Sequence, residues 1–241
     1  MRTLITITKI KLPLANAYLI QGERAILVDT GAPGDAARII QALHRANVAP
    51  TDLALILLTH GHGDHVGAAN EVAAASGAPV ALHRADDAMA RSGRNMLGTL
   101  TGLEARLITP FVNKPFPTVA ASLIFDGALD LTPYGVAGRV IATPGHTPGS
   151  VSIIFDNGDA IAGDLLMGGR LGGALHASQP RLHYYVADFA QLHASMTTVL
   201  AAQPQRLLMG HGGPLAADAV RRRWQGGASA QVAARRVRTG A

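Results

Sequence analysis

The chain has 241 residues, of which 48% are hydrophobic and only 15% are charged. A chain of this length and composition can bury a substantial core, and we expect one generous domain over residues 1–241. The absence of cysteine excludes disulfides and thiolate metal ligands. No stretch is long and apolar enough to predict a membrane span, so no membrane partner is expected.

The net charge of +5 comes from the C-terminal end of the chain. Seven arginines and one acid lie from residue 206 onward: Arg206, Arg221, Arg222, Arg223, Arg235, Arg236 and Arg238, with Asp218. The preceding part carries fourteen basic and fifteen acidic residues, so we predict a frayed basic tail over 225–241 and no nucleic-acid partner. The N-terminus lacks the layout of a signal peptide, which favours the cytoplasm.

The first half of the chain alternates between strand and helix patterns. β-Branched or continuous apolar runs predict strands, and apolar residues at helical spacing predict helices. The predicted strands cover 3–10, 17–20, 25–28, 52–58 and 80–82, and the predicted helices cover 35–46, 68–76 and 85–91. This alternation predicts an α/β fold.

Two less regular stretches interrupt the second half. Residues 92–118 contain several glycines and prolines and predict a lid, a pocket wall or a homodimer contact. Residues 165–186 are glycine-rich and predict a mobile loop that forms a substrate wall. The other predicted elements are strands at 122–125, 128–131, 139–142, 151–155, 160–162 and 206–209, and helices at 188–202 and 215–223.

A dense group of candidate metal ligands follows the apolar run at 52–58. His60, His62, Asp64 and His65 fall within six positions. In an extended segment two side chains separated by one residue leave on the same side, and the intervening glycines allow the backbone to bend tightly beneath a ligand. Imidazole nitrogen and carboxylate oxygen are ligands that zinc and related ions prefer. This segment therefore predicts a metal site at the end of a strand.

Further candidate ligands occur singly at the ends of other predicted strands. His146, Asp164 and His211 each stand next to a glycine, which predicts side chains that converge at one edge of a sheet. Asp29 ends the strand at 25–28. Two roles are open for it: a turn cap, or an acceptor for the N–H of a ligand histidine.

Taken together and in this order, the 59–65 segment, His146, Asp164 and His211, with Asp29 upstream, resemble the metallo-β-lactamase-fold superfamily of hydrolases. The resemblance implies an αββα sandwich, with two mixed sheets flanked by helices and the site at one edge. It also implies two metal ions: one held by His60, His62 and His146, a second held by Asp64, His65 and His211, and Asp164 as the bridge between them.

Two cations that share an aspartate and a water would lower the pKa of that water, and the resulting hydroxide would attack a carbonyl carbon. Asp64 is the candidate catalytic residue, because it could pass a proton toward the leaving group. A ligand set of histidine and aspartate without soft ligands suits Zn²⁺, with iron or manganese as alternatives. The expected partner is a small-molecule acyl substrate.

The resemblance leaves several activities open. True metallo-β-lactamases typically carry cysteine or serine where Asp164 stands, which disfavours antibiotic hydrolysis. The glyoxalase II-like group, which hydrolyses thioesters, is the first choice, and lactonases of the acyl-homoserine lactone type and aryl esterases are the alternatives. From other classes come a mononuclear iron persulfide dioxygenase and a non-catalytic binding module.

Candidate substrate contacts lie near the end of the glycine-rich stretch, at His183, Tyr184 and Tyr185. A tyrosine hydroxyl close to the metals could donate a hydrogen bond to an oxyanion, as in the lactonase branch. The alternative is a surface loop whose tyrosines pack on the last helix.

Overall fold

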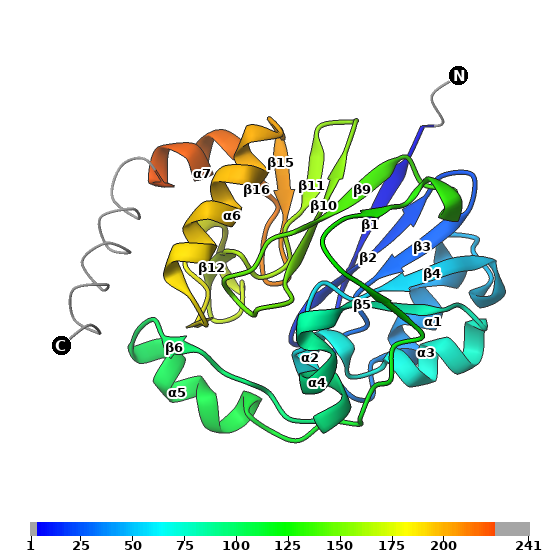
Figure 1. Ribbon diagram of the computed structural model, residues 1–241, viewed down its shortest axis with the longest axis horizontal. Helices are drawn as coiled ribbons and strands as arrows, with labels where there is room; N and C mark the ends of the chain where they lie inside the picture. Colours follow the sequence, from blue (N-terminus) through cyan, green and yellow to red (C-terminus); the bar gives the residue numbers. More distant parts are fainter. Residues whose placement is uncertain (1–3, 225–241) are drawn as a thin grey trace.

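A computed structural model of the protein describes residues 4–224 and places two six-stranded sheets face to face, with helices on both outer surfaces (Figure 1). This arrangement confirms the predicted αββα sandwich. The predicted basic tail at 225–241 lies outside the described residues.

The first sheet has the strand order β1-β2-β3-β4-β5-β7. Its strands are β1 (Thr6–Lys11), β2 (Asn16–Gln21), β3 (Ala25–Val28), β4 (Leu53–Leu57), β5 (Val80–His83) and β7 (Leu123–Phe125). The first three strands pair antiparallel, whereas β3, β4, β5 and β7 run parallel. Val28 pairs with Leu57, so Asp29 and the histidine-rich segment both emerge at the same edge.

The second sheet has the order β16-β15-β11-β10-β9-β8. Its strands are β8 (Leu129–Asp130), β9 (Gly138–Ala142), β10 (Val151–Phe155), β11 (Asp159–Ile161), β15 (Arg206–Leu208) and β16 (Leu215–Ala216). β9, β11 and β15 run in one direction, because β10 is antiparallel to both β9 and β11, and β11 is parallel to β15. Their carboxyl ends therefore lie at one edge, where His146, Asp164 and His211 follow.

Apolar layers lie between the sheets and under the helices. On β2, Leu19 packs beneath α1 (Ala36–Arg45) and α3 (Ala69–Ser76), while its neighbours Tyr18 and Ile20 face the second sheet. This alternation is the period-two geometry of a strand that is buried on both faces. The second sheet is covered by α6 (Phe189–Ala201) and α7 (Ala217–Arg223). Within residues 4–224, no helix combines the length and apolar character that a membrane span needs.

The stretch at 92–118 is more regular than its composition suggests. It holds β6 (Thr99–Leu100) and the ten-residue helix α5 (Leu103–Val112). The helix starts directly after Gly102, and Pro110 lies inside its last turn, where the missing N–H removes one backbone hydrogen bond. A helix therefore forms here although it follows a glycine and contains a proline. The remaining α-helices of residues 4–224 are the short α2 (Gly63–Val66) and α4 (Arg84–Ser92), and two 3₁₀ helices cover Pro50–Asp52 and Thr132–Tyr134.

The stretch at 165–186, expected to be a mobile loop, is a hairpin of β12 (Met167–Arg170) and β13 (Leu175–Arg181), followed by β14 (Tyr185–Val186). The glycines serve close backbone packing: a Cβ at Gly168 would overlap the carbonyl oxygen of Ala177. β14 pairs with β6 and so joins this hairpin to α5. The segment at 215–223, predicted as one helix, begins with the short strand β16, and α7 follows it.

Candidate metal centre

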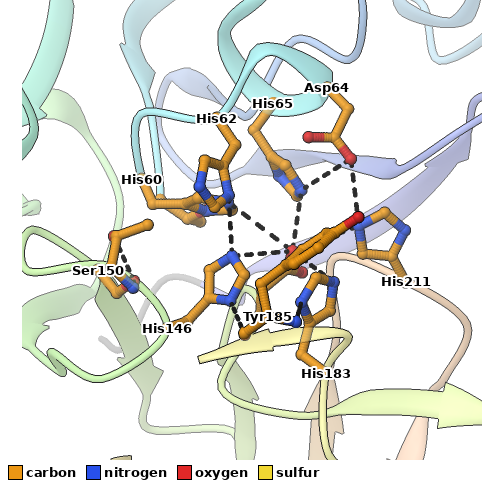
Figure 2. Close-up of polar contacts among 12 residues, drawn as sticks. His60, His62, Asp64, His65, His146, Ser150, His183, Tyr185 and His211 are labelled. Atoms are coloured by element: carbon orange, nitrogen blue, oxygen red, sulfur yellow. Dashed lines mark hydrogen bonds and ion pairs between the residues drawn. The ribbon is translucent and has the colours of Figure 1, made fainter. Parts of the chain in front are cut away.

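All seven candidate ligands, which follow the ends of four strands (β4, β9, β11 and β15), lie together at one edge of the sandwich. Figure 2 shows the five histidines and Asp64 of this cluster. Four groups bring their ligand atoms within 4.8 Å of one another. These groups are His60–His62–His146, His60–His65–Asp164, Asp64–His65–His211 and His146–Asp164–His183. The structure therefore brings the predicted residues together and adds His183 to them.

Asp164 lies at the centre of this cluster. Its Oδ2 is surrounded by the Nε2 atoms of five histidines, at 3.7 Å for His60, 3.3 Å for His65, 3.6 Å for His146, 3.2 Å for His183 and 3.3 Å for His211. Oδ2 of Asp64 is 3.4 Å from Nε2 of His211. Asp164 thus stands between the candidate set His60–His62–His146 and the candidate set Asp64–His65–His211.

The two facing nitrogens of His62 and His146 show that the cluster suits a cation. Nδ1 of His62 lies 3.0 Å from Nε2 of His146. The other nitrogen of each ring faces a backbone carbonyl, Met96 O at 3.2 Å and Tyr185 O at 2.9 Å. Because a carbonyl accepts, each ring donates its hydrogen there, and the facing nitrogens both carry lone pairs. Two lone pairs at this distance repel one another, and a metal ion is the partner that both could bind.

The other histidines show the same pattern. Nδ1 of His65 donates to Asp29 at 2.9 Å, and Nδ1 of His211 donates to the carbonyl of Leu14 at 2.8 Å. Their Nε2 atoms, and that of His60, are buried without a hydrogen-bond partner among residues 4–224. Buried polar atoms are seldom left unpaired, and unprotonated imidazole nitrogen is a ligand for divalent metals. The donor set therefore fits such ions.

Asp29 holds the histidine-rich segment in place. Its Oδ1 accepts from the backbone N–H of Thr59 at 2.7 Å, and its Oδ2 accepts from the Thr59 hydroxyl at 2.8 Å. Because that hydroxyl donates to Asp29, it can accept from Nδ1 of His60, 3.0 Å away. Of the two roles left open by the sequence, the structure shows the contact with a histidine, since His65 also donates to Asp29. Such contacts fix the tautomer and orientation of metal-binding histidines.

The family model of the metallo-beta-lactamase superfamily matches residues 11–191. The chain belongs to this superfamily. A hydroxyacylglutathione hydrolase of Acidiphilium cryptum is 34% identical over 210 residues, which cover 86% of this chain and 68% of that protein. The probable metallo-hydrolase YqgX of Bacillus subtilis is 35% identical over 161 residues, covering 66% of this chain and 69% of its own. These relatives identify a metal-dependent hydrolase.

Solved structures of the superfamily share the fold. The family protein TTHA1429 from Thermus thermophilus aligns with a TM-score of 0.67 at 23% identity, over 95% of this chain and 79% of that one. The metallo-β-lactamase MIM-1 from Novosphingobium pentaromativorans aligns with a TM-score of 0.67 at 19% identity, over 98% and 89%.

The two candidate ligand sets of this metallo-β-lactamase superfamily member differ in charge. Burial, together with neighbouring imidazoles, holds the pKa of His60 and His146 well below the usual range, so both rings are neutral. Burial also acts on His211, but the carboxylates of Asp164 and Asp64 outweigh it and raise its pKa to about 10. The second set therefore holds a proton at neutral pH when no metal displaces it.

A cavity of about 610 Å³ opens onto the candidate metal centre. Its lining includes Asp64, Asp164, His183 and His211 of the candidate metal centre, which we call the floor, and also Lys9 and Lys11. The apolar lining comes from the β1–β2 turn, the α5 region and the hairpin: Leu14, Leu97, Ile108, Phe111, Val112 and Leu171. The floor is thus polar and the wall apolar, as in many small-molecule sites.

The two tyrosines proposed as substrate contacts border this cavity, but their hydroxyls bind protein groups. The Tyr184 hydroxyl donates to Glu104 at 2.5 Å and accepts from the N–H of Gly172 at 2.9 Å. The Tyr185 hydroxyl lies 3.2 Å from that of Thr109. Both tyrosines therefore tie α5 to the strands beside the centre.

Asp86 is an organising residue that the sequence reasoning missed. It is fully buried and accepts from the N–H of Gly61 at 2.9 Å, the N–H of Gly149 at 2.8 Å and the hydroxyl of Thr147 at 2.7 Å. It thus joins the loop of His60 to the loop of His146. The available signal was an acid on the same helical face as the buried Met89 and Ala90.

Proposed function

We propose that the chain is a dinuclear hydrolase, loaded with Zn²⁺, that cleaves an ester-like acyl bond, with a thioester as the first choice. The observation that carries the proposal is the position of Asp164 between two ligand sets, His60–His62–His146 and Asp64–His65–His211. A single shared carboxylate between two sets is the arrangement expected of a two-metal site.

Divalent ions held by these sets would supply hydroxide at neutral pH and polarise the substrate carbonyl. The histidines bind and orient the ions, and Asp29 and Asp86 keep the histidine loops in register. Asp64 is the proposed catalytic acid–base group. Its side chain remains 24% exposed and borders the cavity, so it can reach a leaving group.

The relatives favour a thioester. The hydroxyacylglutathione hydrolase of Acidiphilium cryptum aligns over most of this chain, and one from Anaeromyxobacter dehalogenans is 36% identical over 162 residues. Lys9 and Lys11 border the cavity and would attract an anionic thiol portion such as glutathione.

A lactone is the second candidate, because the apolar wall formed by the α5 region and the hairpin is suited to an acyl chain. Leu97, Ile108 and Phe111 border the cavity in this wall. An aryl ester would use the same surface.

The test begins with elemental analysis of the purified full-length protein. S-Lactoylglutathione, N-acyl-homoserine lactones and p-nitrophenyl acetate are then compared as substrates. We expect two equivalents of zinc per chain and the highest kcat/KM for the thioester. One equivalent of iron, with oxygen uptake on addition of glutathione persulfide, would instead identify a persulfide dioxygenase.

A further inference from the structure

His183 lies inside the cluster but differs from the other histidines in its hydrogen bonding. Its ring centroid is 4.4 Å from that of His146 and 5.2 Å from that of His211 (Figure 2). Its Nε2 is 3.2 Å from Oδ2 of Asp164. By distance alone it is either an additional metal ligand or a hydrogen-bond donor to whatever enters the cavity.

The hydrogen-bond network separates these two roles. Each of the five candidate ligand histidines turns one ring nitrogen toward an acceptor, which leaves the other with a lone pair for a metal. The acceptors are the carbonyls of Met96, Tyr185 and Leu14, the carboxylate of Asp29 and the hydroxyl of Thr59. This is the usual arrangement of metal-binding histidines.

His183 has the opposite arrangement. Its Nδ1 accepts a hydrogen bond from the backbone N–H of Tyr185 at 3.4 Å. A nitrogen that accepts cannot itself carry a hydrogen, so the ring hydrogen of His183 stands on Nε2. Nε2 therefore has no lone pair in the ring plane to offer a metal.

His183 borders the cavity with a side chain that is 5% exposed, and Oδ2 of Asp164 lies 3.2 Å from its Nε2–H. Four of the candidate ligand histidines approach the same carboxylate oxygen. The neighbouring tyrosines are not available as hydrogen-bond donors to a substrate. The hydroxyl of Tyr184 already binds Glu104, and the hydroxyl of Tyr185 binds Thr109. A carboxylate that bridges two metal ions, as proposed for Asp164, would have little capacity left to accept from this N–H, and a buried N–H requires an acceptor. A substrate oxygen entering the cavity would provide one.

The backbone around His183 is fixed. Its carbonyl accepts from the Thr101 hydroxyl at 2.8 Å, and the N–H of Thr101 donates to the carbonyl of Tyr184 at 3.0 Å. The pairing of β14 with β6 continues this contact. The ring is consequently held in place before any substrate arrives, which is what an effective donor at a reacting centre requires.

We propose that His183 is a catalytic hydrogen-bond donor and not a metal ligand: its Nε2–H binds the carbonyl oxygen of the substrate's ester-like group. The proposal rests on the proposed hydrolase function. The donor is strongest where negative charge develops on that oxygen, and the ring keeps its hydrogen throughout. A preorganised donor of this kind typically contributes on the order of 100-fold to kcat.

The first test compares H183F with H183Q in the zinc-loaded, full-length protein and uses S-lactoylglutathione as substrate. Phenylalanine fills the space without a donor, while the glutamine amide can place an N–H near the position of Nε2. We expect kcat to fall about 100-fold in H183F, with a smaller change in KM, and to recover at least in part in H183Q. Equal kcat losses in both variants would overturn the proposal.

Zinc content and zinc affinity, measured by competition with a chromophoric chelator, provide a readout that does not depend on turnover. We expect both variants to bind two equivalents with wild-type affinity. Loss of one equivalent in H183F would make His183 a ligand and overturn the proposal.

A second measurement is independent of any substrate. In the zinc-loaded protein labelled with ¹⁵N-histidine, long-range ¹H–¹⁵N spectra report which ring nitrogen carries the hydrogen. We expect His183 to carry it on Nε2, whereas His65, His146 and His211 carry it on Nδ1. A hydrogen on Nδ1 of His183 would overturn the inference. If wild-type protein hydrolysed none of the substrates tested, the proposed function would fail, and this spectrum would still report the ring state.

Discussion

Asp29 and His65, 36 residues apart in the chain, are joined by a buried hydrogen bond of 2.9 Å between Oδ2 and Nδ1. The same carboxylate binds the backbone and hydroxyl of Thr59. One acid thereby sets the orientation of the segment that carries four candidate ligands.

Replacing this acid should weaken metal binding without removing a ligand. In D29N an amide N–H₂ replaces one acceptor oxygen, so either Thr59 or His65 loses its partner. We expect zinc affinity to fall by about 10- to 100-fold, as measured by chelator competition. D126N, which removes a charge from an exposed pair with Arg84, is the matched control and should bind zinc normally.

Gly210 must remain without a side chain for Asp164 to keep its position. A Cβ there would overlap Oδ1 of Asp164 and lie 2.7 Å from Cε1 of His65. We therefore expect G210A to lose at least one equivalent of zinc although every candidate ligand is present. G102A, where a Cβ meets nothing within 4 Å, should retain both, and the measurement is metal content after gel filtration. Full zinc content in G210A would show that the loop adapts.

Asp164 should be essential to metal binding and to hydrolysis. In D164A the shared carboxylate is lost, so we expect at least one metal position to empty and kcat/KM for the best substrate to fall by at least about 1,000-fold. Elemental analysis and steady-state kinetics check this. Full occupancy with an undiminished rate would rule out the bridging role.

Metal binding should release protons mainly from the Asp64–His65–His211 set. His211, whose pKa the carboxylates raise to about 10, is protonated at neutral pH in the metal-free protein, and a ligand must lose its proton to bind. Affinity at the Asp64–His65–His211 set should therefore rise with pH up to about 10, roughly tenfold per unit for each proton released. The set of His60, His62 and His146, whose pKa values are lowered, should change little between pH 7 and 8.

Calorimetric titration of zinc into metal-free protein checks this dependence. Runs in two buffers that differ in ionisation enthalpy give the number of protons released at each step. Two steps with equal proton release would contradict the assigned difference between the sets.

Asp86 should stabilise the folded protein, because it joins the loop of His60 to the loop of His146. D86A leaves three buried donors, from Gly61, Thr147 and Gly149, without their acceptor. At about 1 kcal/mol or more for each donor, we expect a loss of about 3 kcal/mol in the free energy of unfolding. Urea denaturation of the metal-free protein measures it. D87A removes a partly exposed i,i+4 pair with Arg91 and should cost well under 1 kcal/mol.

Local patterns were sufficient to predict much of the fold. β3 and β10 begin and end at the predicted residues, because uninterrupted β-branched and apolar runs define buried strands. The candidate ligands could be found for a similar reason: each lies in a short glycine-containing segment that follows a strand. Their convergence then follows from the parallel course of the strands that precede them.

What the sequence did not reveal depends on contacts between distant segments. α5 was hidden by Gly102 and Pro110, although Gly102 only precedes the helix and Pro110 is accommodated in its last turn. Asp86 acts through the backbone of Gly61 and Gly149, which no spacing relates to it. The distinct hydrogen bonding of His183 depends on one backbone N–H and leaves no trace in composition.

The division of the cavity into a floor and a wall has an evolutionary consequence. Every candidate ligand comes from the ends of the two main sheets, whereas much of the apolar wall comes from α5 and the β12–β13 hairpin, held together by Tyr184 and Glu104. Natural selection can therefore remodel residues 97–112 to admit different acyl groups while the reaction chemistry is inherited unchanged.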